Sequence, residues 1–458
     1  RQFLDRNLRT EVARPLLELE DRGLVGDRHG YRLYPHQNIA SQIIGFTDVD
    51  NVGIEGIEKQ FNKNLAGKNG WIVLQKDGKG RSRRNNAYPR MAPVDGSDVY
   101  LTIDLDYQAI LQNELQKRVT RTSAKGAMGV ILEPQTGKVL AMSSLPDFDP
   151  NGPATFPRET YRNRAVTDQF EPGSTFKVVL ATAALSYNSV GKHEEFNCGD
   201  GSYNFRGLVI KDWEKFSLLT FPQIIQNSSN VGTVKIAERI GPKNLYSIGR
   251  KFGFGSLSGI SFPGETKGVF KQTKDWSGIS IAEISIGYEV SVTTLQMALA
   301  YGAVANGGFL MKPQIVEKII HPSGNVSYEA EPQVIRQVAS KKVMDELTDM
   351  LELVVSKGTG TKANLPGWNV AGKTGTAKKY VDGEYSNNRF VTSFAGFFPA
   401  HDPKMVAVII LDEPKNGFHW GSEGSAPVFQ AVMKRIVQAD DSILVYKRMG
   451  QELSLIHI

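Results

Sequence analysis

The chain has 458 residues, 40% of them apolar, and a formal net charge of +6 at pH 7. This length leaves room for two or three domains and a sizeable core. The sequence lacks the like-charge block of a nucleic-acid arm and the run of about 18 apolar residues of a membrane span. Cys198 is the only cysteine, which excludes an internal disulfide, and the seven scattered histidines make a metal site unexpected.

Residues 1–95 are charged and rich in turn formers, and they are expected to form a region of their own. The range Thr10–Arg22 predicts a helix, because apolar residues recur on one side of it: Val12, Leu16, Leu17 and Leu19. Residues 75–97 are polar, contain glycine and proline, and predict a linker or a long hairpin. The basic cluster Lys79–Arg84 is interpreted as part of a solvated linker rather than a binding patch.

The rest of the chain is typical of a layered α/β (α+β) domain. A strand, a helix and two further strands are predicted in turn at Val99–Ile103, Asp106–Val119, Met128–Leu132 and Val139–Ser143. Two more strands and a long helix are predicted at Phe390–Phe398, Met405–Leu411 and Ala426–Val437. Hairpin strands at both ends, with mainly helical sequence between them, indicate one antiparallel sheet flanked by helices.

Ser174 and Lys177 form a Ser-x-x-Lys pattern between the breaker Pro172–Gly173 and the apolar run 178–184. The pattern predicts a serine at the start of a buried helix, with the lysine on the same face. A serine hydroxyl becomes nucleophilic when a base takes its proton, and burial lowers the pKa of a lysine toward that role. A capping serine beside an incidental lysine remains the alternative. A second match, Ser189–Lys192, lies in a polar loop and is set aside.

Ser228 to Asn230 form a Ser-x-Asn pattern, which occurs five times in the chain. This copy stands out because it follows the amphipathic segment 218–225 and precedes the apolar segment 231–236. Polar side chains at i and i+2 between two apolar helices are expected to project into a cleft. There the hydroxyl could relay a proton and the amide could hold a peptide group. A simple interhelical turn remains the alternative.

The only Lys-Thr-Gly sequence of the chain begins at Lys373 and continues with Thr376. In a β-strand, Thr374 and Thr376 would share one face, and the other two residues would point the opposite way. At Gly375 the backbone of a ligand can approach closely, which suits a peptide that ends in a carboxylate. Residues 367–374 also match a phosphate-binding loop. However, the Asp-Gly turn downstream predicts a strand hairpin instead of the helix that such a loop needs.

The order Ser-x-x-Lys, Ser-x-Asn, Lys-Thr-Gly is typical of penicillin-binding proteins and serine β-lactamases. The surrounding sequence resembles that family as well. Gly129–Ala141 is similar to the hairpin that opens the transpeptidase domain, and Ile286–Gln296 with Ala305–Gly308 is similar to the segment between the last two motifs. Gln42–Phe46 and Gly53–Glu58 resemble the pedestal (dimerisation) domain of class B, monofunctional members.

The resemblance implies a domain organisation. Residues 1–95 would be a partial pedestal domain with a linker, 98–445 a penicillin-binding transpeptidase domain of the serine β-lactamase-like fold, and 446–458 a tail. Two departures from the family pattern are visible. The Arg-Gly-x-Ile-x-Asp-Arg-Asn-Gly stretch of the pedestal is absent, so its first strand is expected to be missing. Thr294 stands where the family commonly has proline, which is expected to matter little.

The resemblance also implies a serine-type D,D-transpeptidase that cross-links peptidoglycan stem peptides, of the cell-division type. In the family's mechanism Ser174 attacks the carbonyl of the penultimate D-Ala, with Lys177 as its base. The N–H groups of Ser174 and Thr376 form the oxyanion hole. Ser228 passes a proton to the departing D-Ala, and Asn230 holds the amide of the acyl chain.

Substrate binding is assigned by the same resemblance to the Lys-Thr-Gly-Thr strand. Lys373, Thr374 and Thr376 are implied to bind the terminal carboxylate, with Gly375 leaving room for the peptide. No metal or organic cofactor is implied. The expected partners are stem peptides ending in D-Ala-D-Ala, β-lactam antibiotics that mimic this end, and other membrane proteins of cell-wall synthesis or division. Nucleic acid is not expected among them.

A location at the bacterial inner membrane is expected, with the catalytic domain on the periplasmic face and an anchor ahead of the first residue. Two enzyme alternatives remain, a serine β-lactamase and a D,D-carboxypeptidase, in which water takes the acyl group. Two alternatives without turnover remain as well, a β-lactam sensor and a structural division scaffold. A scaffold would keep its function in cells after Ser174→Ala, whereas an enzyme would lose it.

Overall fold

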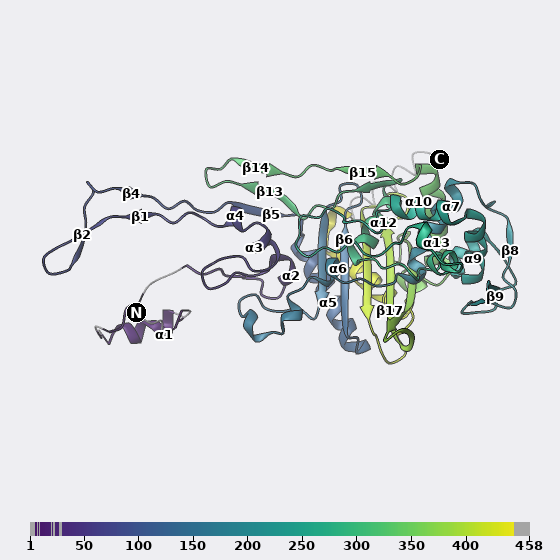
Figure 1. Cartoon of the computed structure of the whole chain (residues 1–458), viewed down its shortest axis with the longest axis horizontal. Coiled ribbons are helices and arrows are strands. Elements are labelled where there is room, and N and C mark those ends of the chain that lie inside the picture. The colour runs from purple at the N-terminus through teal and green to yellow at the C-terminus, as the bar shows by residue number, and fades with distance from the viewer. Residues whose placement is uncertain are drawn as a thin grey trace. The chain divides into compact units, whose positions relative to one another are not determined.

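The computed structural model describes residues 5–6, 8, 10–19, 21, 23–26 and 30–443 (Figure 1). They form two compact units. The N-terminal unit contains the chain before Leu101 and two inserted segments, Phe148–Tyr161 and Lys318–Glu329, and the C-terminal unit contains the rest. The sequence predicted a boundary near residue 98 but neither insertion, because local patterns do not tell on which unit a loop packs. The predicted tail, 446–458, lies outside the described residues.

The N-terminal unit consists of short elements. Its helices are α1 (Thr10–Leu17), α2 (Ser41–Ile44), α3 (Gly56–Gln60) and α4 (Asn62–Leu65). Its strands include β1 (Trp71–Ile72), β2 (Leu74–Lys76), β3 (Ser82–Arg84), β4 (Arg90–Met91) and β14 (Val326–Glu329). Most of β5 (Asp98–Leu101) and of β13 (Val316–Ile320) also belongs to this unit. The helix predicted over Thr10–Arg22 ends at Leu17. None of its residues is buried, and a helix without packing gains little from a further turn.

Residues 71–91 form a long antiparallel hairpin, in which β1 pairs with β4 and β2 with β3. Asp77 shapes the turn, since its carboxylate accepts hydrogen bonds from the N–H groups of Lys79 and Arg81, each at 2.9 Å. Of the two structures predicted for this region, a linker or a long hairpin, the hairpin is therefore confirmed.

An aromatic cluster joins the inserted segment to the rest of the N-terminal unit. Phe46 packs edge-on against Phe148 and Tyr161, with ring centroids 5.8 and 5.0 Å apart. Asn151 adds two hydrogen bonds to the backbone of Tyr34, accepting from its N–H at 3.0 Å and donating to its carbonyl at 2.8 Å. The segment 148–161 thus belongs to this unit through both packing and polar contacts.

A five-stranded antiparallel sheet forms the centre of the C-terminal unit (Figure 1). Its order is β16 (Ala371–Val381), β17 (Glu384–Phe398), β18 (Met405–Asp412), β6 (Gly126–Leu132) and β7 (Val139–Leu145). The predicted hairpin around Asp382 and Gly383 is confirmed as the β16–β17 turn, with both residues at positive φ, 54° and 94°. Strand β16, which carries the Lys-Thr-Gly-Thr sequence, is an edge strand.

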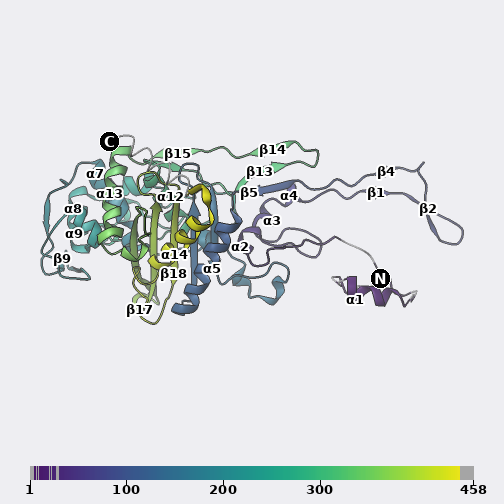
Figure 2. The same cartoon turned by 180° about the vertical axis from the view of Figure 1, so that it is seen from behind.

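Helices cover both faces of this sheet (Figure 2). On one face lie α5 (Leu105–Thr122) and α14 (Ala426–Ala439), and on the other lies α12 (Thr294–Ala305). Strand β18 is buried at all eight positions. Its alternate residues from Met405 to Leu411 join the core under α5 and α14. A strand covered on both sides cannot alternate between apolar and polar residues, which is why its sequence is a continuous apolar run.

The remaining elements of the C-terminal unit are mainly helical. They include α6 (Arg164–Thr167), α7 (Lys177–Ser186), α8 (Phe221–Asn227), α9 (Asn230–Ile240), α10 (Pro242–Lys251), α11 (Ser280–Ser285) and α13 (Lys341–Lys357). Short strands lie at β8 (Glu195–Asn197), β9 (Ser202–Phe205), β10 (Leu208–Lys211), β11 (Leu218–Thr220), β12 (Phe309–Met311) and β15 (Val334–Gln337). Together they confirm the predicted antiparallel sheet with helices around it.

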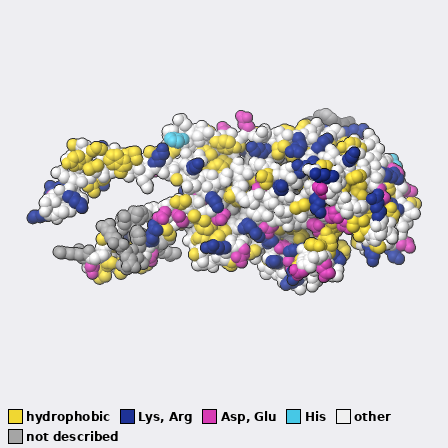
Figure 3. Space-filling view, in the orientation of Figure 1, with side chains coloured by type: hydrophobic (Ala, Val, Ile, Leu, Met, Phe, Trp, Pro, Cys, Tyr) yellow, Lys and Arg dark blue, Asp and Glu magenta, His cyan; other side chains and the backbone are white. Residues whose placement is uncertain are grey.

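The surface of the C-terminal unit carries both signs of charge, with Lys and Arg side chains interspersed among Asp and Glu on the face in Figure 3. No helix among the described residues combines the length and the apolar character needed to cross a bilayer.

Candidate active site

Ser174 lies on a tight turn rather than on the first turn of an α-helix. Gly173–Phe176 is a 3-10 segment, and α7 begins only at Lys177. The turn is held by two hydroxyls, since Thr175 Oγ1 donates to the carbonyl of Pro172 at 2.8 Å and Tyr301 OH donates to the carbonyl of Thr175 at 3.1 Å. The predicted position at the start of a buried helix is therefore shifted by one turn. Ser174 itself is partly exposed, whereas the next three residues are buried.

The segment 287–292 packs against this turn and forms backbone hydrogen bonds with it. Phe170 and Val292 exchange two backbone hydrogen bonds of 3.0 Å, and Gly173 N–H donates to the carbonyl of Gly287 at 3.1 Å. The approach is so close that a Cβ on Gly287 would lie 2.0 Å from the Gly173 oxygen. Only glycine fits there, and its φ of 90° is one that other residues avoid. The turn, called the nucleophile turn after the predicted role of Ser174, is thus fixed by backbone contacts of the residues that precede the serine.

Lys177 is fully buried and its amine contacts the Ser-x-Asn segment. Nζ donates to the carbonyl of Ser228 at 2.7 Å, to the carbonyl of Ser229 at 3.2 Å and to Asn230 Oδ1 at 2.8 Å. Ser228 Oγ lies 3.3 Å away. In the part of the chain that the structure describes, no hydrogen bond joins Nζ to Ser174 Oγ, although the sequence placed the two on one face. Carbonyl oxygens are stronger acceptors, and a buried amine needs them.

Ser228 is the junction between α8 and α9, as the sequence predicted. It has a positive φ of 59°, and Ser229 caps α9 by accepting a hydrogen bond from Gly232 N–H at 2.9 Å. The left-handed conformation is costly for serine. It turns the carbonyls of both serines toward the amine of Lys177. The two serines and Asn230 thus line the same small space as the lysine.

A second buried lysine, Lys373, belongs to the same site. Its Nζ donates a long hydrogen bond of 3.3 Å to the carbonyl of Thr374. Burial, and then the proximity of Lys177, hold the pKa of Lys373 well below its ordinary value. Burial also lowers the pKa of Lys177 to about 7, although the charge of Asp212 opposes this shift. Each amine disfavours a positive charge on the other, because the two lie close together and burial removes the water that would solvate the charges.

The Lys-Thr-Gly-Thr strand has the predicted alternation. Thr374 pairs with Phe394, which belongs to the core under α14. On the opposite face, a Cβ on Gly375 would lie 2.8 Å from the carbonyl of Pro172, beside the nucleophile turn. Thr376 Oγ1 accepts a hydrogen bond from Gly421 N–H at 2.9 Å. Because residues 371–381 form one strand, the phosphate-loop alternative is wrong.

Two acidic residues of the site were not predicted as functional. Asp212 contacts Ser229 and the start of α9. Glu171 accepts hydrogen bonds from Glu289 N–H at 2.9 Å and from Tyr385 OH at 3.1 Å. Its Oε2 is buried and has no hydrogen-bond partner among the described residues. Burial raises the pKa of Glu171 to about 7. Its place three residues before Ser174 was a signal that could have been used, whereas Asp212 stands 16 residues ahead of the Ser-x-Asn pattern with no local mark.

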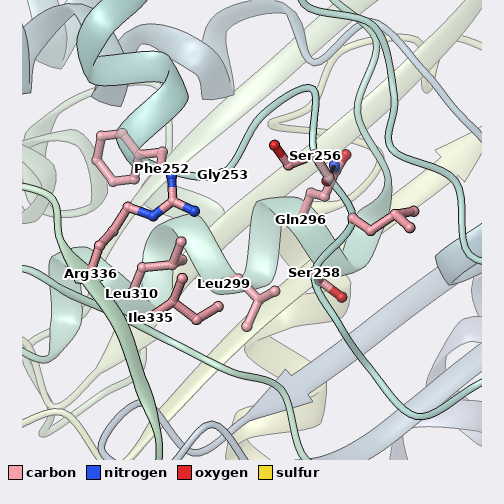
Figure 4. A pocket seen from close by; sticks show the side chains of 10 residues that line it. Phe252, Gly253, Ser256, Ser258, Gln296, Leu299, Leu310, Ile335 and Arg336 are labelled. Carbon is pink, nitrogen blue, oxygen red and sulfur yellow. Dashed lines mark hydrogen bonds between the residues drawn. The ribbon is translucent and has the colours of Figure 1, made fainter.

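The C-terminal unit also contains a pocket away from Ser174, shown in Figure 4. Its lining consists of Phe252, Gly253, Ser256, Leu257, Ser258, Gln296, Leu299, Leu310, Ile335 and Arg336. The amide of Gln296 donates to the carbonyls of Ser256 and Lys267 at 2.9 and 3.0 Å. It therefore holds the protein's own loops, and the candidate site remains the one around Ser174.

Comparison with known families decides what kind of protein carries this site. A family model of the penicillin binding protein transpeptidase domain matches residues 127–434. The chain belongs to the penicillin-binding protein transpeptidase family. A model of the penicillin-binding protein dimerisation domain matches residues 11–101, and this pairing of domains places the protein in class B, as its motifs predicted.

Curated relatives and solved structures agree with this assignment. This chain is 33% identical over 441 residues to the peptidoglycan D,D-transpeptidase FtsI of Escherichia coli. The alignment covers 95% of this chain and 72% of FtsI. It is 33% identical over 433 residues to stage V sporulation protein D of Bacillus subtilis, covering 94% and 67%. Penicillin-binding protein 3 from Mycobacterium tuberculosis, solved with aztreonam, is similar with a TM-score of 0.80 and 31% identity over 89% of this chain and 90% of that one.

Proposed function

We propose that this class B penicillin-binding protein is a peptidoglycan D,D-transpeptidase that cross-links stem peptides in cell-wall synthesis during division. The family assignment and the similarity to FtsI support the activity. The observation that carries the proposal is a fully buried lysine, Lys177, with a pKa lowered to about 7, one turn after a partly exposed serine. An amine with this pKa can accept and return a proton at neutral pH.

The proposed first step is acylation of Ser174. Its Oγ forms a bond to the carbonyl carbon of the penultimate D-Ala, and its proton passes to Lys177 Nζ. The N–H groups of Ser174 and Thr376 stabilise the oxyanion, a contribution typically worth about 3 kcal/mol per donor. When the bond to the terminal D-Ala breaks, its nitrogen takes a proton relayed through Ser228. Asn230 holds the acyl chain, and the amine of a second stem peptide then displaces the serine.

The carboxylate of the terminal D-Ala is proposed to bind beside Lys373, Thr374 and Thr376, with Gly375 leaving space for the peptide. A carboxylate there would raise the pKa of Lys373, since an opposite charge favours its protonated form. A protonated Lys373 would in turn disfavour a proton on Lys177, leaving that amine neutral and ready to act as the base. Substrate binding would in this way prepare the nucleophile.

The domain bounds follow as proposals: a pedestal domain with linker over 1–95 and a transpeptidase domain over 98–445. Binding of β-lactams and of peptidoglycan is a property of the family. We further propose stem peptides ending in D-Ala-D-Ala as this chain's substrates, membrane proteins of division as its partners, and the outer face of the inner membrane as its location. The division role is proposed from the Ser-Ser-Asn and Ser-Thr-Phe-Lys sequences. Identity does not separate it from a sporulation role, because the chain is 33% identical both to FtsI and to the sporulation protein.

Labelling with a fluorescent penicillin tests the proposal. We expect Ser174→Ala to lose labelling by at least about a thousandfold, as for other serine acyl-enzymes. Ser189→Ala, in the second Ser-x-x-Lys pattern, is the matched control and should label like the wild type. A D-Ala-D-Ala peptide with an added amine acceptor should yield the cross-linked dimer. Release of acid alone would instead make the protein a carboxypeptidase, and rapid turnover of a cephalosporin would make it a β-lactamase.

A further inference from the structure

Asp212 lies on the turn after β10 and binds the Ser-x-Asn segment through three donors. Its Oδ2 accepts a hydrogen bond from Ser229 Oγ at 2.8 Å. Its Oδ1 accepts from Val231 N–H at 3.0 Å and also from Asn230 N–H. The backbone N–H groups at the start of a helix lack partners within the helix, and a carboxylate is the strongest acceptor for them. One side chain thus fixes three consecutive residues of α9 and its cap.

Lys211, the residue before Asp212, also contacts Asn230. The carbonyl of Lys211 accepts a hydrogen bond from Asn230 Nδ2 at 3.0 Å, while Asn230 Oδ1 accepts from Lys177 Nζ at 2.8 Å. The side-chain amide of Asn230 is therefore oriented by the β10 turn on one side and by the buried amine on the other. Rotation of the amide would place its nitrogen against the amine and lose both bonds.

We propose that Asp212 is a positioning residue for acylation: its carboxylate holds residues 228–230 in the arrangement in which their oxygen atoms receive Lys177 Nζ. This inference rests on the proposed function and adds a residue to it that no sequence pattern marks. Among the described residues, no hydrogen bond joins Asp212 to Ser174 or to the Lys-Thr-Gly-Thr strand. Asp212 acts through Ser229, Asn230 and the amine that they bind.

The negative charge of Asp212 gives the proposed role a measurable effect, because it acts on the pKa of Lys177. A residue that only capped the helix would not change that pKa. Among the described residues, two titratable side chains interact with the amine of Lys177: Asp212 on the turn after β10, and Lys373 on β16. The helices that pack on α7 are α9, α10, α11 and α13, and in the described part of the chain none of them adds a charge that shifts this amine. The negative charge of Asp212 opposes the effect of burial and raises the pKa of Lys177. Loss of that charge therefore favours the neutral amine at lower pH.

The test is the pH dependence of the second-order rate of β-lactam acylation, measured from about pH 5 to 9 on the whole chain. For Asp212→Asn we expect the plateau rate to fall by about tenfold, and the midpoint of the acidic limb to move down by up to about one pH unit, as expected for loss of a nearby opposite charge. Asp212→Glu keeps the charge and should keep the wild-type midpoint, with a lower plateau because the carboxylate is displaced by one methylene. Glu214→Gln, an exposed acid two residues away, is the matched control and should behave as wild type.

A plateau that falls with an unmoved midpoint would overturn the inference and leave Asp212 as a helix cap. An unchanged profile in Asp212→Asn would overturn it as well. If that variant does not fold, the midpoint of Asp212→Glu decides, since a shift despite the retained charge would contradict the electrostatic role. Failure of the proposed function is a different result, because the wild type itself would then not be acylated at Ser174.

Discussion

Two fully buried lysines determine the chemistry of the site at the scale of single residues. Lys177 and Lys373 lie close enough for the charge of one to lower the pKa of the other, and each loses its water on folding. Such groups are costly for stability, which is why ordinary cores exclude them. In this protein the cost is tied to the proposed function, because burial is what lowers the pKa of the Lys177 amine to about 7.

The first prediction concerns the base. Acylation needs the neutral amine of Lys177, so the rate should rise with pH through about 7 and fall roughly tenfold per pH unit below that value. Lys177→Arg keeps a cation that cannot act as a base and should lose at least about a hundredfold in rate. Lys192→Arg, in the second Ser-x-x-Lys pattern, should match the wild type. A stopped-flow rate that stays flat between about pH 5.5 and 8 would contradict the assignment of Lys177.

The second prediction concerns Glu171, whose pKa is raised to about 7 by burial. The folded state binds a proton more tightly than the unfolded state, so this carboxyl stabilises the protein below its unfolded pKa. The contribution is lost as pH rises through about 7. Glu171→Gln mimics the protonated form. The melting temperature of the variant minus that of the wild type should therefore increase between about pH 5 and 8. A difference that is independent of pH would show that Glu171 does not titrate there.

At the scale of elements, the site depends on how closely backbones approach one another. The turn that carries Ser174 lies between strand β16 and the segment 287–292, and glycine provides the room on both sides. A Cβ on Gly375 would lie 2.2 Å from Ser393 Oγ and 2.8 Å from the carbonyl of Pro172. The glycine of the Lys-Thr-Gly sequence thus serves the packing of the nucleophile turn as well as the access of a ligand.

The third prediction tests this packing. Gly287→Ala places a methyl group 2.0 Å from the Gly173 oxygen, so the nucleophile turn must shift. Acylation should slow by at least about tenfold, and stability should fall by about 2 kcal/mol. Gly207→Ala is the matched control, because Gly207 has the same φ of 90° but open space around it. It should cost about 1 kcal/mol of strain and leave the acylation rate unchanged. Equal effects of the two variants on acylation would refute the contact.

At the scale of the whole molecule, the chain divides into two units with separate cores. The residues proposed for catalysis all belong to the C-terminal unit. The inserted segment 148–161 belongs to the N-terminal unit, although the residues on either side of it in the sequence belong to the C-terminal unit. Its aromatic residues pack with Phe46.

The fourth prediction follows from this division. A protein beginning at Asp98 should react with penicillin at Ser174 within about threefold of the full rate, because a domain with its own core folds alone. It should melt at a lower temperature, since Phe148 and Tyr161 lose the aromatic partner that covers them. Mass spectrometry of the acylated peptide and a thermal melt measure the two quantities. A folded but unreactive protein would mean that the N-terminal unit is needed to complete the site.

Local sequence patterns predicted the strands of the central sheet, the helices α5, α7 and α14 and the order of the three motifs. The helices α10, α12 and α13 were not predicted individually. The predicted features are encoded within a few residues by periodicity, turn formers and chemical type. The hairpin at Asp382–Gly383, the continuous apolar strand β18 and the junction at Ser228 were all predicted on that basis. The length of α1 and the 3-10 turn at Ser174 were not, because packing rather than local preference decides where a helix begins and ends.

Which side chains meet in the site depends on the tertiary fold. It brings Lys177 to carbonyls 51 and 52 residues away, instead of to the serine one turn before it. It places Tyr385 against Glu171 across 214 residues, and Asp212 under α9. The pKa of a side chain depends on burial and on neighbouring charges, and both of these are properties of the folded chain. The motif residues alone therefore do not set the reactivity of the site, because it depends on the burial and the neighbouring charges that the fold provides.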